Sequence, residues 1–575
     1  MTRILDSFEV LGNGVPIEKR FICNSLSEIT NPYEGLLTYC LEDSITYQYA
    51  NGKFNIFSNG VYVNVKDFGA KGDRVHDDTL AIQRAINSIK NNEYDAIKRG
   101  GVVFFPSGSY HISDTIELPS FITLMGEGDL SSILYLADGV NKDMIKTENF
   151  DALLESGKSW FDVSGVPMGF GIKNLGLFGN RTHNDNCNGI SIYGYFYKIE
   201  NVTINYCGGT GFFSKHGNEM GGTEVYQANF SKFFETKIDN LNVKYCKSRG
   251  IDYNGPTDSA LNNLYVSECE GDFGASFTKA CYIGDIHLYG NNRTNTSGCG
   301  LNVNADCYIK NVVSESNYGG GVQIKSWLAH IERCQMYGNR HYNLSILANS
   351  NYTKFGSVDI KPLKNDVTSI SIASDDIVID KVTIFGDVDF TYTKQAISVF
   401  TSNNTIINNC FLGNIKGGGV ALACNQGSKL SNIKANGIIK NCDVAFSPGA
   451  GFNGNSNIEL LVERSASQKT LEFDFEPTIT DTISIKEKID GSYNVLFPYS
   501  FNVADTYLEF TNRNSKQLNV TNSKGKYLQP LSTNVAVATI DESYNVTPVA
   551  NGTCVIILSL NGISKYVYVN VNIAE

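Results

Sequence analysis

Five carboxylate side chains in the middle of the chain have the types and spacing needed for acid and base chemistry. The densest group is Glu268, Glu270 and Asp272 in the segment SECEGDFG, with Asp252 before it and Glu315 after it. Cleavage of a glycosidic bond uses two carboxyl groups, about 5 Å apart for retention and about 6.5 to 9.5 Å apart for inversion. A pair drawn from these five residues is our first hypothesis for a catalytic site, although an isolated acid of this kind is more often a solvated turn residue.

A second set of side chains in the same region could carry β-elimination from a uronic acid instead. That reaction needs a base near the abstracted proton and a positive charge that neutralises the sugar carboxylate. The residues with these properties are Lys244, Arg249, His287, Tyr289 and Lys325. Both chemistries stay open at the level of sequence.

These residues lie within a repeat, in which a Gly followed by an apolar residue stands ten positions after an Asn. Neighbouring copies commonly start 22 to 28 residues apart, a length typical of one coil of a β-solenoid. The clearest copies are NVTINYCGGTGFF from Asn201, NLNVKYCKSRGID from Asn240, NVVSESNYGGGVQ from Asn311 and NCFLGNIKGGGVA from Asn409. Weaker copies begin at Asn174, Asn263, Asp285, Arg333 and Lys381.

Each copy alternates apolar residues at the first and third positions after its start with polar or aromatic residues at the second and fourth. This alternation predicts strands with one inward and one outward face, and it excludes helical repeats. Cys207, Cys246 and Cys269 each stand six positions after the Asn, so we expect one interior column of thiols. The Asn itself is expected to form a turn.

The outward positions of successive coils should stack about 4.8 Å apart and form columns on the surface. Aromatic faces beside carboxylates and amides suit a sugar chain, whose ring faces are apolar and whose rims carry hydroxyls. The fourth position of each copy gives Lys244, Ser267, Tyr289, Glu315 and Tyr337, and the second gives Asn242, Tyr265, His287, Val313 and Gln335. The predicted substrate-binding residues are Tyr265, His287, Tyr289, Tyr337, Lys244 and Lys325.

The composition narrows the possible partners. The chain has 575 residues, 54 Gly and a formal net charge of −12, which argues against nucleic acid because phosphates are bound by clustered Lys and Arg. Its 14 Cys lack the spacing of a metal site, so we expect buried thiols, no metal and no cofactor. The first residues lack the pattern of a secretory signal and no apolar run reaches membrane-spanning length, so we expect cytoplasmic synthesis without membrane insertion.

A different segment precedes the repeat: VNVKDFGAKGDRVHDDTLAIQRAINSIK from Val63, then GGVVFFPSGSYHI from Gly100. It resembles the first segment of the right-handed parallel β-helices of the pectate-lyase superfamily found in phage tailspikes. Asp77 or Asp78 is expected to cap a helix that closes the solenoid, and Arg74 stands where the family often has Gly. The apolar stripe of that helix would be Ala81, Ile82, Ala85, Ile86 and Ile89.

Both ends of the chain differ from the repeat. Residues 1–60 predict a small β-module with a hairpin turn at Asn51 and Gly52, and they resemble modules near the start of phage tail and appendage proteins. A cap for the solenoid is the alternative. The repeat stops near residue 465, and residues 466–575 predict a β-sandwich similar to bacterial immunoglobulin-like domains. The β-helix would therefore occupy residues 61–465.

The resemblance implies an all-β phage tailspike or appendage protein, usually a homotrimer, that is produced in the host cytoplasm, carried on the virion and active at the host cell surface. Its partner would be a bacterial surface polysaccharide. The preferred hypothesis is a depolymerase that hydrolyses glycosidic bonds with paired carboxylates. The alternatives are a polysaccharide lyase, an adhesin that binds without cleaving, and a structural spike whose C-terminal sandwich alone recognises the host.

Overall fold

The computed structural model describes most of the chain, and every structural statement below concerns the described residues. They are residues 9–11, 15–17, 22–42, 45–50, 52–56, 62–90, 100–156, 165–216, 235–362, 368–386, 395–400, 402–417, 419–424, 430, 432–448, 455–471, 482–497, 501–522, 528–560 and 563–574. The chain divides into two compact units, Met1–Ser345 and Ile346–Glu575. Each unit is considered by itself.

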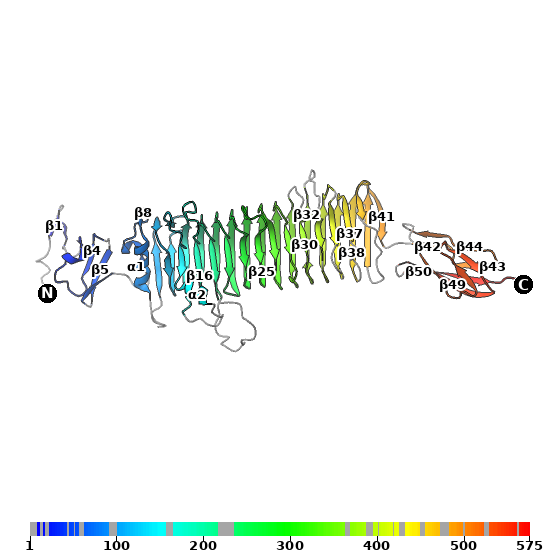
Figure 1. Ribbon diagram of the computed structural model, residues 1–575, viewed down its shortest axis with the longest axis horizontal. Helices are drawn as coiled ribbons and strands as arrows, with labels where there is room; N and C mark the ends of the chain where they lie inside the picture. The colour runs from blue at the N-terminus through cyan, green and yellow to red at the C-terminus, as the bar shows by residue number, and fades with distance from the viewer. Residues whose placement is uncertain are drawn as a thin grey trace, which may run out of the picture. The chain divides into compact units, whose positions relative to one another are not determined.

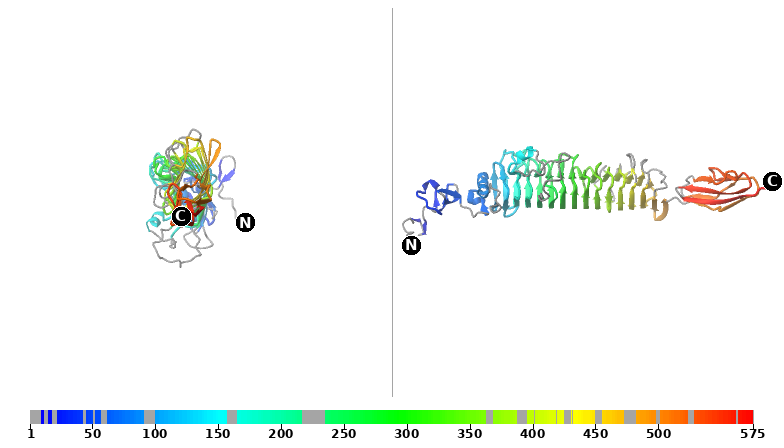
Figure 2. Two further views of the ribbon diagram at one scale, coloured as in Figure 1. Left: turned by 90° about the vertical axis from the view of Figure 1, so that its right-hand side faces the viewer. Right: turned by 90° about the horizontal axis from the view of Figure 1, so that it is seen from below.

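Most of the first unit is a stack of parallel strands in two sheets (Figure 1), and the strands lie side by side along the stack (Figure 2). The sheet of longer strands contains β10 (Gly108–Ile112), β12 (Ile122–Gly126), β13 (Ser132–Leu136), β15 (Gly171–Phe178), β17 (Lys198–Asn205), β19 (Lys237–Lys244), β21 (Ser259–Ser267), β23 (Cys281–Tyr289), β25 (Cys307–Glu315) and β27 (Ala329–Tyr337). The sheet of shorter strands contains β11 (Ile116–Leu118), β14 (Ile145–Thr147), β16 (Ile190–Tyr193), β18 (Phe212–Lys215), β20 (Ile251–Asn254), β22 (Phe273–Phe277), β24 (Cys299–Val303) and β26 (Gly320–Ile324).

Each coil consists of one long strand, a corner, one short strand and a return, which confirms the predicted parallel β-helix. The inward positions align in register from coil to coil, as in Leu264 opposite Ile286 and Ile286 opposite Val312. The repeated Asn bends the long strand: Asn201, Asn240 and Asn263 have φ values of 52°, 56° and 51°. Asn tolerates this left-handed conformation better than most residues, which explains its place in the repeat.

The Gly that stands ten positions after each repeated Asn is explained by the packing between coils. A Cβ on Gly250 would lie 2.2 Å from Val266 Cγ1 and 3.2 Å from Cys269 Sγ, both in the neighbouring coil. A Cβ on Gly211 would meet Val243 Cγ1 at the same 2.2 Å. The short strand therefore begins where only a residue without a side chain fits between coils.

The predicted interior column of thiols is present, and in the later coils the thiol side chains of this column are replaced by amide side chains. Cys207, Cys246 and Cys269 are fully buried, and the next three coils place amides at the same position of the repeat. The Nδ2 of Asn291 donates to Asn317 Oδ1 (3.1 Å), and the Nδ2 of Asn317 donates to Asn339 Oδ1 (2.8 Å). An interior ladder of amides satisfies its own hydrogen bonds, as buried polar groups must.

All 14 cysteines are free and buried, so the prediction of structural thiols is confirmed. Burial raises the pKa of Cys299, Cys410 and Cys424 to about 12. Because the thiolate is the reactive form, these side chains are inert at neutral pH.

The N-terminal end of the stack is closed by helix α1 (Thr79–Ile89), which follows β8 (Asp73–Asp77) in the chain. The helix lies beside η2 (Val65–Phe68), β7 (Tyr62–Asn64), β9 (Gly101–Phe105) and β11. Its side chains Ala81, Ile82, Ala85 and Ile86 are buried, as the apolar stripe predicts, and Ile89 is partly buried. Arg74 adopts a left-handed φ of 65°, in the place where the family often has Gly.

The acidic residues before helix α1 have structural roles. Asp77 accepts the backbone N–H of Thr79 at 3.0 Å, whereas Asp78 makes no side-chain cap. The carboxylate of Asp78 instead accepts the N–H groups of Lys71 (2.7 Å) and Gly72 (3.0 Å), which holds the preceding turn. Of the two alternatives, Asp77 supplies the side-chain hydrogen bond, and Asp78 occupies the N-cap position without one.

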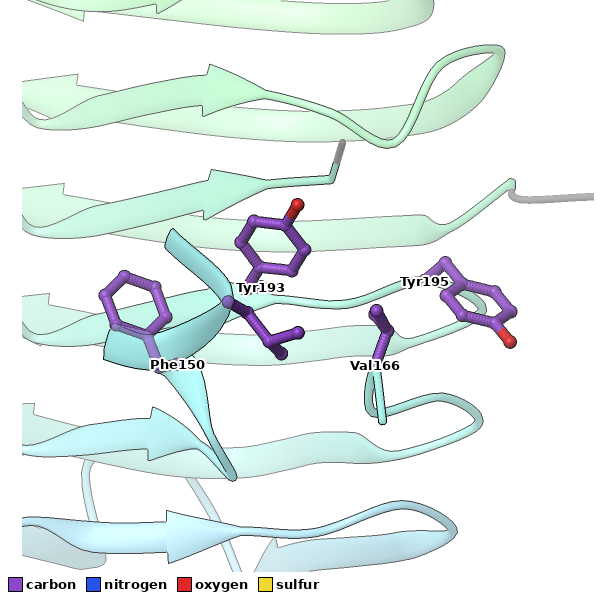
Figure 3. Close-up of a cluster of buried hydrophobic side chains, with 5 residues drawn as sticks. Phe150, Val166, Tyr193 and Tyr195 are labelled. Carbon is purple, nitrogen blue, oxygen red and sulfur yellow. The ribbon is translucent and has the colours of Figure 1, made fainter. Parts of the chain in front are cut away.

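A satellite hydrophobic cluster lies on the outside of the short-strand sheet. Helix α2 (Phe150–Ser156) contributes Phe150 and Leu153, which pack with Val166, Tyr193 and Tyr195. Figure 3 shows Phe150 and Val166 on either side of Tyr193, which projects from β16. This cluster covers the outer face of that sheet at β16.

The N-terminal strands form two small sheets. One pairs β1 (Glu9–Leu11) with β2 (Val15–Ile17), and the other orders β3 (Ile22–Cys23), β4 (Leu37–Cys40), β5 (Ile45–Ala50) and β6 (Lys53–Ile56), with η1 (Leu26–Glu28) after β3. Ala50 pairs with Lys53, which confirms the hairpin; Asn51 of its turn lies outside the described residues.

The second unit begins with further parallel strands. Its longer-strand sheet contains β29 (Lys354–Lys361), β31 (Val378–Ile379), β32 (Val382–Phe385), β34 (Ile406–Gly413), β36 (Lys434–Lys440), β38 (Asn457–Arg464) and β40 (Thr482–Ile489). The sheet also contains β41 (Ser492–Phe497), which pairs antiparallel with β40. Its shorter-strand sheet contains β30 (Ile370–Ile372), β33 (Gln395–Val399), β35 (Val420–Cys424), β37 (Val444–Pro448) and β39 (Lys469–Leu471). Strand β40 pairs in parallel with β38, so the predicted boundary at residue 465 falls inside the ladder.

The C-terminal strands form sheets with alternating burial, as a sandwich requires. One sheet pairs β42 (Phe501–Val503) with β45 (Val520–Asn522). A second has the order β43 (Tyr507–Phe510), β50 (Ile563–Val571), β49 (Gly552–Leu560) and β46 (Gln529–Ser532). A third has the order β44 (Lys516–Gln517), β48 (Asn545–Pro548) and β47 (Ala538–Ile540). No helix in the described part of the chain is long and apolar enough to span a membrane.

Candidate functional site

The two outward columns predicted from the repeat form in the expected register on the long-strand sheet. Strand pairing places Tyr289 opposite Ser267 and Glu315 opposite Tyr289. The adjacent column places His287 opposite Tyr265 in the same way. Period-2 alternation and an in-register ladder are sufficient to produce this alignment, because neither depends on the corners between strands.

Side chains in these columns contact one another across four coils. Lys244 Nζ lies 4.9 Å from the centre of the Tyr265 ring, and that ring meets the His287 ring edge to face at 5.1 Å. His287 Nε2 lies 3.1 Å from Glu315 Oε1. We call Lys244, Tyr265, His287 and Glu315 the outer row. Tyr289, which is 38% exposed, stands beside it.

The outer row combines a cation, a tyrosine ring and an imidazole that is hydrogen-bonded to a carboxylate. Donation from His287 Nε2 to the Glu315 carboxylate fixes the ring orientation, and in the neutral imidazole this tautomer has its lone pair on Nδ1. A carboxylate that orients an imidazole in this way is a recurrent arrangement for a general base. The cation of Lys244 stands two coils away, where it can meet a negative group of a bound ligand.

The acids of the SECEGDFG segment do not converge, because each pairs with a different arginine. Glu268 bonds to Arg293, and Glu270 forms an ion pair with Arg181 at 3.0 Å. All four side chains lie at the corners between the long and short strands. The idea of one dense catalytic cluster in this segment is therefore replaced by separate ion pairs.

Asp272 and Asp252 are brought together by a single arginine. Arg249 binds Asp272 through Nε and Nη2, both at 2.7 Å, and binds Asp252 through Nη1 at 2.9 Å. Burial, which is the larger influence, raises the pKa of Asp252. Burial also pushes that of Asp272 upward, but the hydrogen bonds and charge of Arg249 leave its pKa lowered. This arginine-bridged pair holds two carboxylates with opposite shifts in pKa.

The remaining predicted residues lie at the edges of the outer row or apart from it. Tyr337 follows Glu315 in the same column. Lys325 follows β26 in the other sheet and is exposed, where its backbone N–H bonds to Val303. Lys325 is therefore not part of the outer row.

A stack of aromatic rings at the corners of the early coils was not predicted. The rings of Tyr135 and Phe178 are 5.0 Å apart and nearly parallel, and those of Tyr206 and Tyr245 are 4.8 Å apart. The two tyrosines both stand five positions after the repeated Asn, and this signal in the sequence could have revealed them. In the next coil, Glu268 occupies the position that corresponds to Tyr245, so the stack of rings ends at the corner that carries Glu268 and Glu270.

No cluster of three or more His, Cys, Asp or Glu side chains suited to a metal ion occurs among the described residues. The polar groups that could contact a ligand are instead the outer row and the arginine-bridged pair. They belong to different faces of the coil, because the first projects from the long strands and the second lies at β20 and β22.

Comparison with known proteins agrees with the fold. Residues 62–295 match the family described as "Rhamnogalacturonase A/epimerase, pectate lyase-like". The preneck appendage protein of Bacillus phage PZA is 25% identical over 325 residues, which are 51% of this chain and 31% of that protein. Mannuronan C5-epimerase AlgE5 of Azotobacter vinelandii is 34% identical over 140 residues, which are 23% of this chain and 12% of the epimerase.

Among solved structures, the A-module of Azotobacter vinelandii mannuronan C-5 epimerase AlgE4 covers 73% of this chain and all of the module, with 18% identity and a TM-score of 0.45. The alignments to the two curated relatives span less than a third of either protein. Residues 62–295 are thus similar to a pectate lyase-like family, and about half of the chain is similar to a phage preneck appendage protein.

Proposed function

We propose that this protein is carried on a phage virion, binds a polysaccharide of the host surface and cleaves it along the β-helix. Similarity to phage appendage proteins supports the virion location, and similarity to an epimerase named for mannuronan supports a polysaccharide ligand. The observation that carries the proposal is the outer row, where a cation, a tyrosine ring, an oriented imidazole and a carboxylate occupy consecutive coils.

The chemistry that fits the outer row best is β-elimination from a uronic acid. Lys244 neutralises the sugar carboxylate, and His287 Nδ1 takes the proton from the carbon next to it. The electron pair of that C–H bond forms a double bond as the neighbouring C–O bond breaks, and the Tyr289 hydroxyl protonates the leaving oxygen. The outer row offers only one carboxylate, Glu315, and it is bonded to His287, so two-carboxylate hydrolysis is less suited to this surface.

Hydrolysis is the second candidate, and the arginine-bridged pair favours it. Asp252 and Asp272 bind the same guanidinium, and a pair of neighbouring carboxyl groups is what glycosidases use. Their opposite pKa shifts would assign Asp252 as the acid and Asp272 as the base or nucleophile. A ligand would first have to displace Arg249 from both carboxylates.

One experiment separates these chemistries. Purified host surface polysaccharide is incubated with the full-length protein, and the products are analysed by size and by ultraviolet absorbance. Shortened fragments with a new double-bond absorbance indicate elimination, and shortened fragments without it indicate hydrolysis. Binding without shortening indicates an adhesin, which would refute the enzymatic part of the proposal.

Matched variants assign the residues. We expect His287→Gln to reduce elimination by about 100-fold or more, as loss of a general base does. The exposed His341 provides the control, and His341→Gln should have no effect. If Asp252→Asn abolishes cleavage while His287→Gln does not, the hydrolytic assignment replaces the first one.

We further propose that the N-terminal module attaches the protein to the virion and that the protein is a homotrimer. Ile22, Leu37, Tyr39 and Leu41 of this module are large apolar side chains left exposed. Exposed apolar residues gathered in a small sheet indicate a contact surface. The expected result is that Leu37→Ser with Tyr39→Ser yields folded protein that does not assemble onto virions; unchanged assembly would refute the attachment role.

A further inference from the structure

A cavity of about 340 Å³ lies at the opposite end of the same long strands that carry the outer row. It is formed where the chain returns from the short strands and enters β21, β23, β25 and β27. Its floor is Ala280, Cys281 and Cys307, and the two thiols are buried with their sulfur atoms 3.4 Å apart. The volume falls at the lower end of the range of about 300 to 1,000 Å³ for ligand sites.

The walls of the cavity are aromatic and exposed. Tyr282, Tyr308 and His330 occupy one column in consecutive coils, with ring centres 6.4 Å and 5.0 Å apart. Tyr282 is 59% exposed, and Leu328 at the next return is 50% exposed. Apolar side chains of this size gathered around a hollow on an acidic, polar surface indicate a binding site.

The charges around the cavity limit what it can bind. Asp258 and Asp306 line it, and neither Lys nor Arg is among the described residues that do. Oδ1 of Asp306 accepts the backbone N–H of Leu328 (3.1 Å) and the hydroxyl of Ser326 (3.0 Å), which holds the carboxylate in place at the rim. A uronate would be repelled there, whereas sugar hydroxyls can donate to carboxylates while a pyranose face lies on an aromatic ring.

We propose that this cavity is a second saccharide subsite, which takes a neutral sugar unit of the same polysaccharide. This inference rests on the proposed function, because it adds a contact for a neutral sugar to the outer row, which suits an anionic sugar. Tyr282 and His287 lie on one strand, at most about 17 Å apart, a span that a short oligosaccharide bridges. The ligand is therefore a mixed polymer of uronate and neutral units that crosses the strands.

Calorimetric titration of the full-length protein with defined hexasaccharides tests the subsite. The probes are neutral glucose, mannose, galactose and N-acetylglucosamine oligomers beside hexagalacturonate, in a His287→Gln background that prevents cleavage. At least one neutral oligomer is expected to bind, with affinity lowered about tenfold by Tyr282→Ala. Tyr568→Ala, which removes a similarly exposed tyrosine from β50, is the control and should leave binding unchanged.

Removal of the two carboxylates gives an independent readout. Asp258→Asn with Asp306→Asn keeps the shape of the cavity and should strengthen hexagalacturonate binding. The subsite is refuted if no neutral oligomer binds, if Tyr282→Ala leaves binding intact, or if Tyr282→Ala changes the oligomeric state in sedimentation, which would make the patch a contact between copies. Neutral binding without cleavage of any host polysaccharide would refute the enzymatic proposal and leave the subsite standing.

Discussion

The interior amide ladder allows a prediction whose magnitude follows from the structure. Asn317 is fully buried, and its Oδ1 accepts two hydrogen bonds from Asn291. One comes from the backbone N–H of Asn291 at 3.0 Å, and the other from the Nδ2 of Asn291 at 3.1 Å. Asn317→Ala leaves two buried donors of Asn291 without this acceptor. Each such group costs about 1 to 3 kcal/mol, so we expect the coil to lose about 2 to 6 kcal/mol of stability.

A thiol variant separates the hydrogen bonds from the volume. Asn317→Cys places the residue type of the earlier coils in the same column, fills much of the space and still lacks the strong acceptor. Both variants are expected to lower the opening free energy of amides in β23, β25 and β27, measured by native-state hydrogen exchange. Asn295, which is exposed at the preceding corner, provides the control variant Asn295→Ala. A loss below about 1 kcal/mol in Asn317→Ala would refute the assignment of the ladder as a stabilising network.

Three further predictions concern packing, charge and reactivity. Gly250→Ala should lower the melting temperature measured by circular dichroism, because its Cβ would lie 2.2 Å from Val266 Cγ1; an unchanged value would contradict the packing argument. The lowered pKa of Asp272 contributes stability above pH 3.8 that is lost as pH falls through its folded-state pKa, so Asp272→Asn should lessen acid destabilisation in a pH series of thermal melts. The raised pKa of Asp252 has the opposite effect, because the folded protein loses stability as pH rises from 3.8 through the folded-state pKa of this residue. Asp252→Asn should remove that loss. The same pH response from both variants would refute the two pKa directions. Native protein should react with a thiol reagent far more slowly than denatured protein, because Cys299 and the other thiols are buried, and rapid reaction would contradict this.

The repeat in the sequence determined the fold and the register of the outer row. Apolar positions two apart and a constant offset from each Asn are local properties, so they place His287 beside Tyr265 without knowledge of any other part of the chain. The same offsets placed the buried thiols of Cys246 and Cys269 in one column. The identity of the strands that carry the outer row could therefore be predicted.

Only the tertiary structure decided which charges meet at the corners. Arg181 pairs with Glu270 across 89 positions of sequence, and Arg249 joins Asp252 to Asp272 in the next coil. Corner segments vary in length and lack the period of the strands, so the direction of their side chains is set by packing between coils and not by spacing. For that reason the sequence located the acids but could not say that arginines already neutralise them. It also gave no sign of the cavity at Tyr282, whose lining combines the first residues of successive long strands with the returns that precede them.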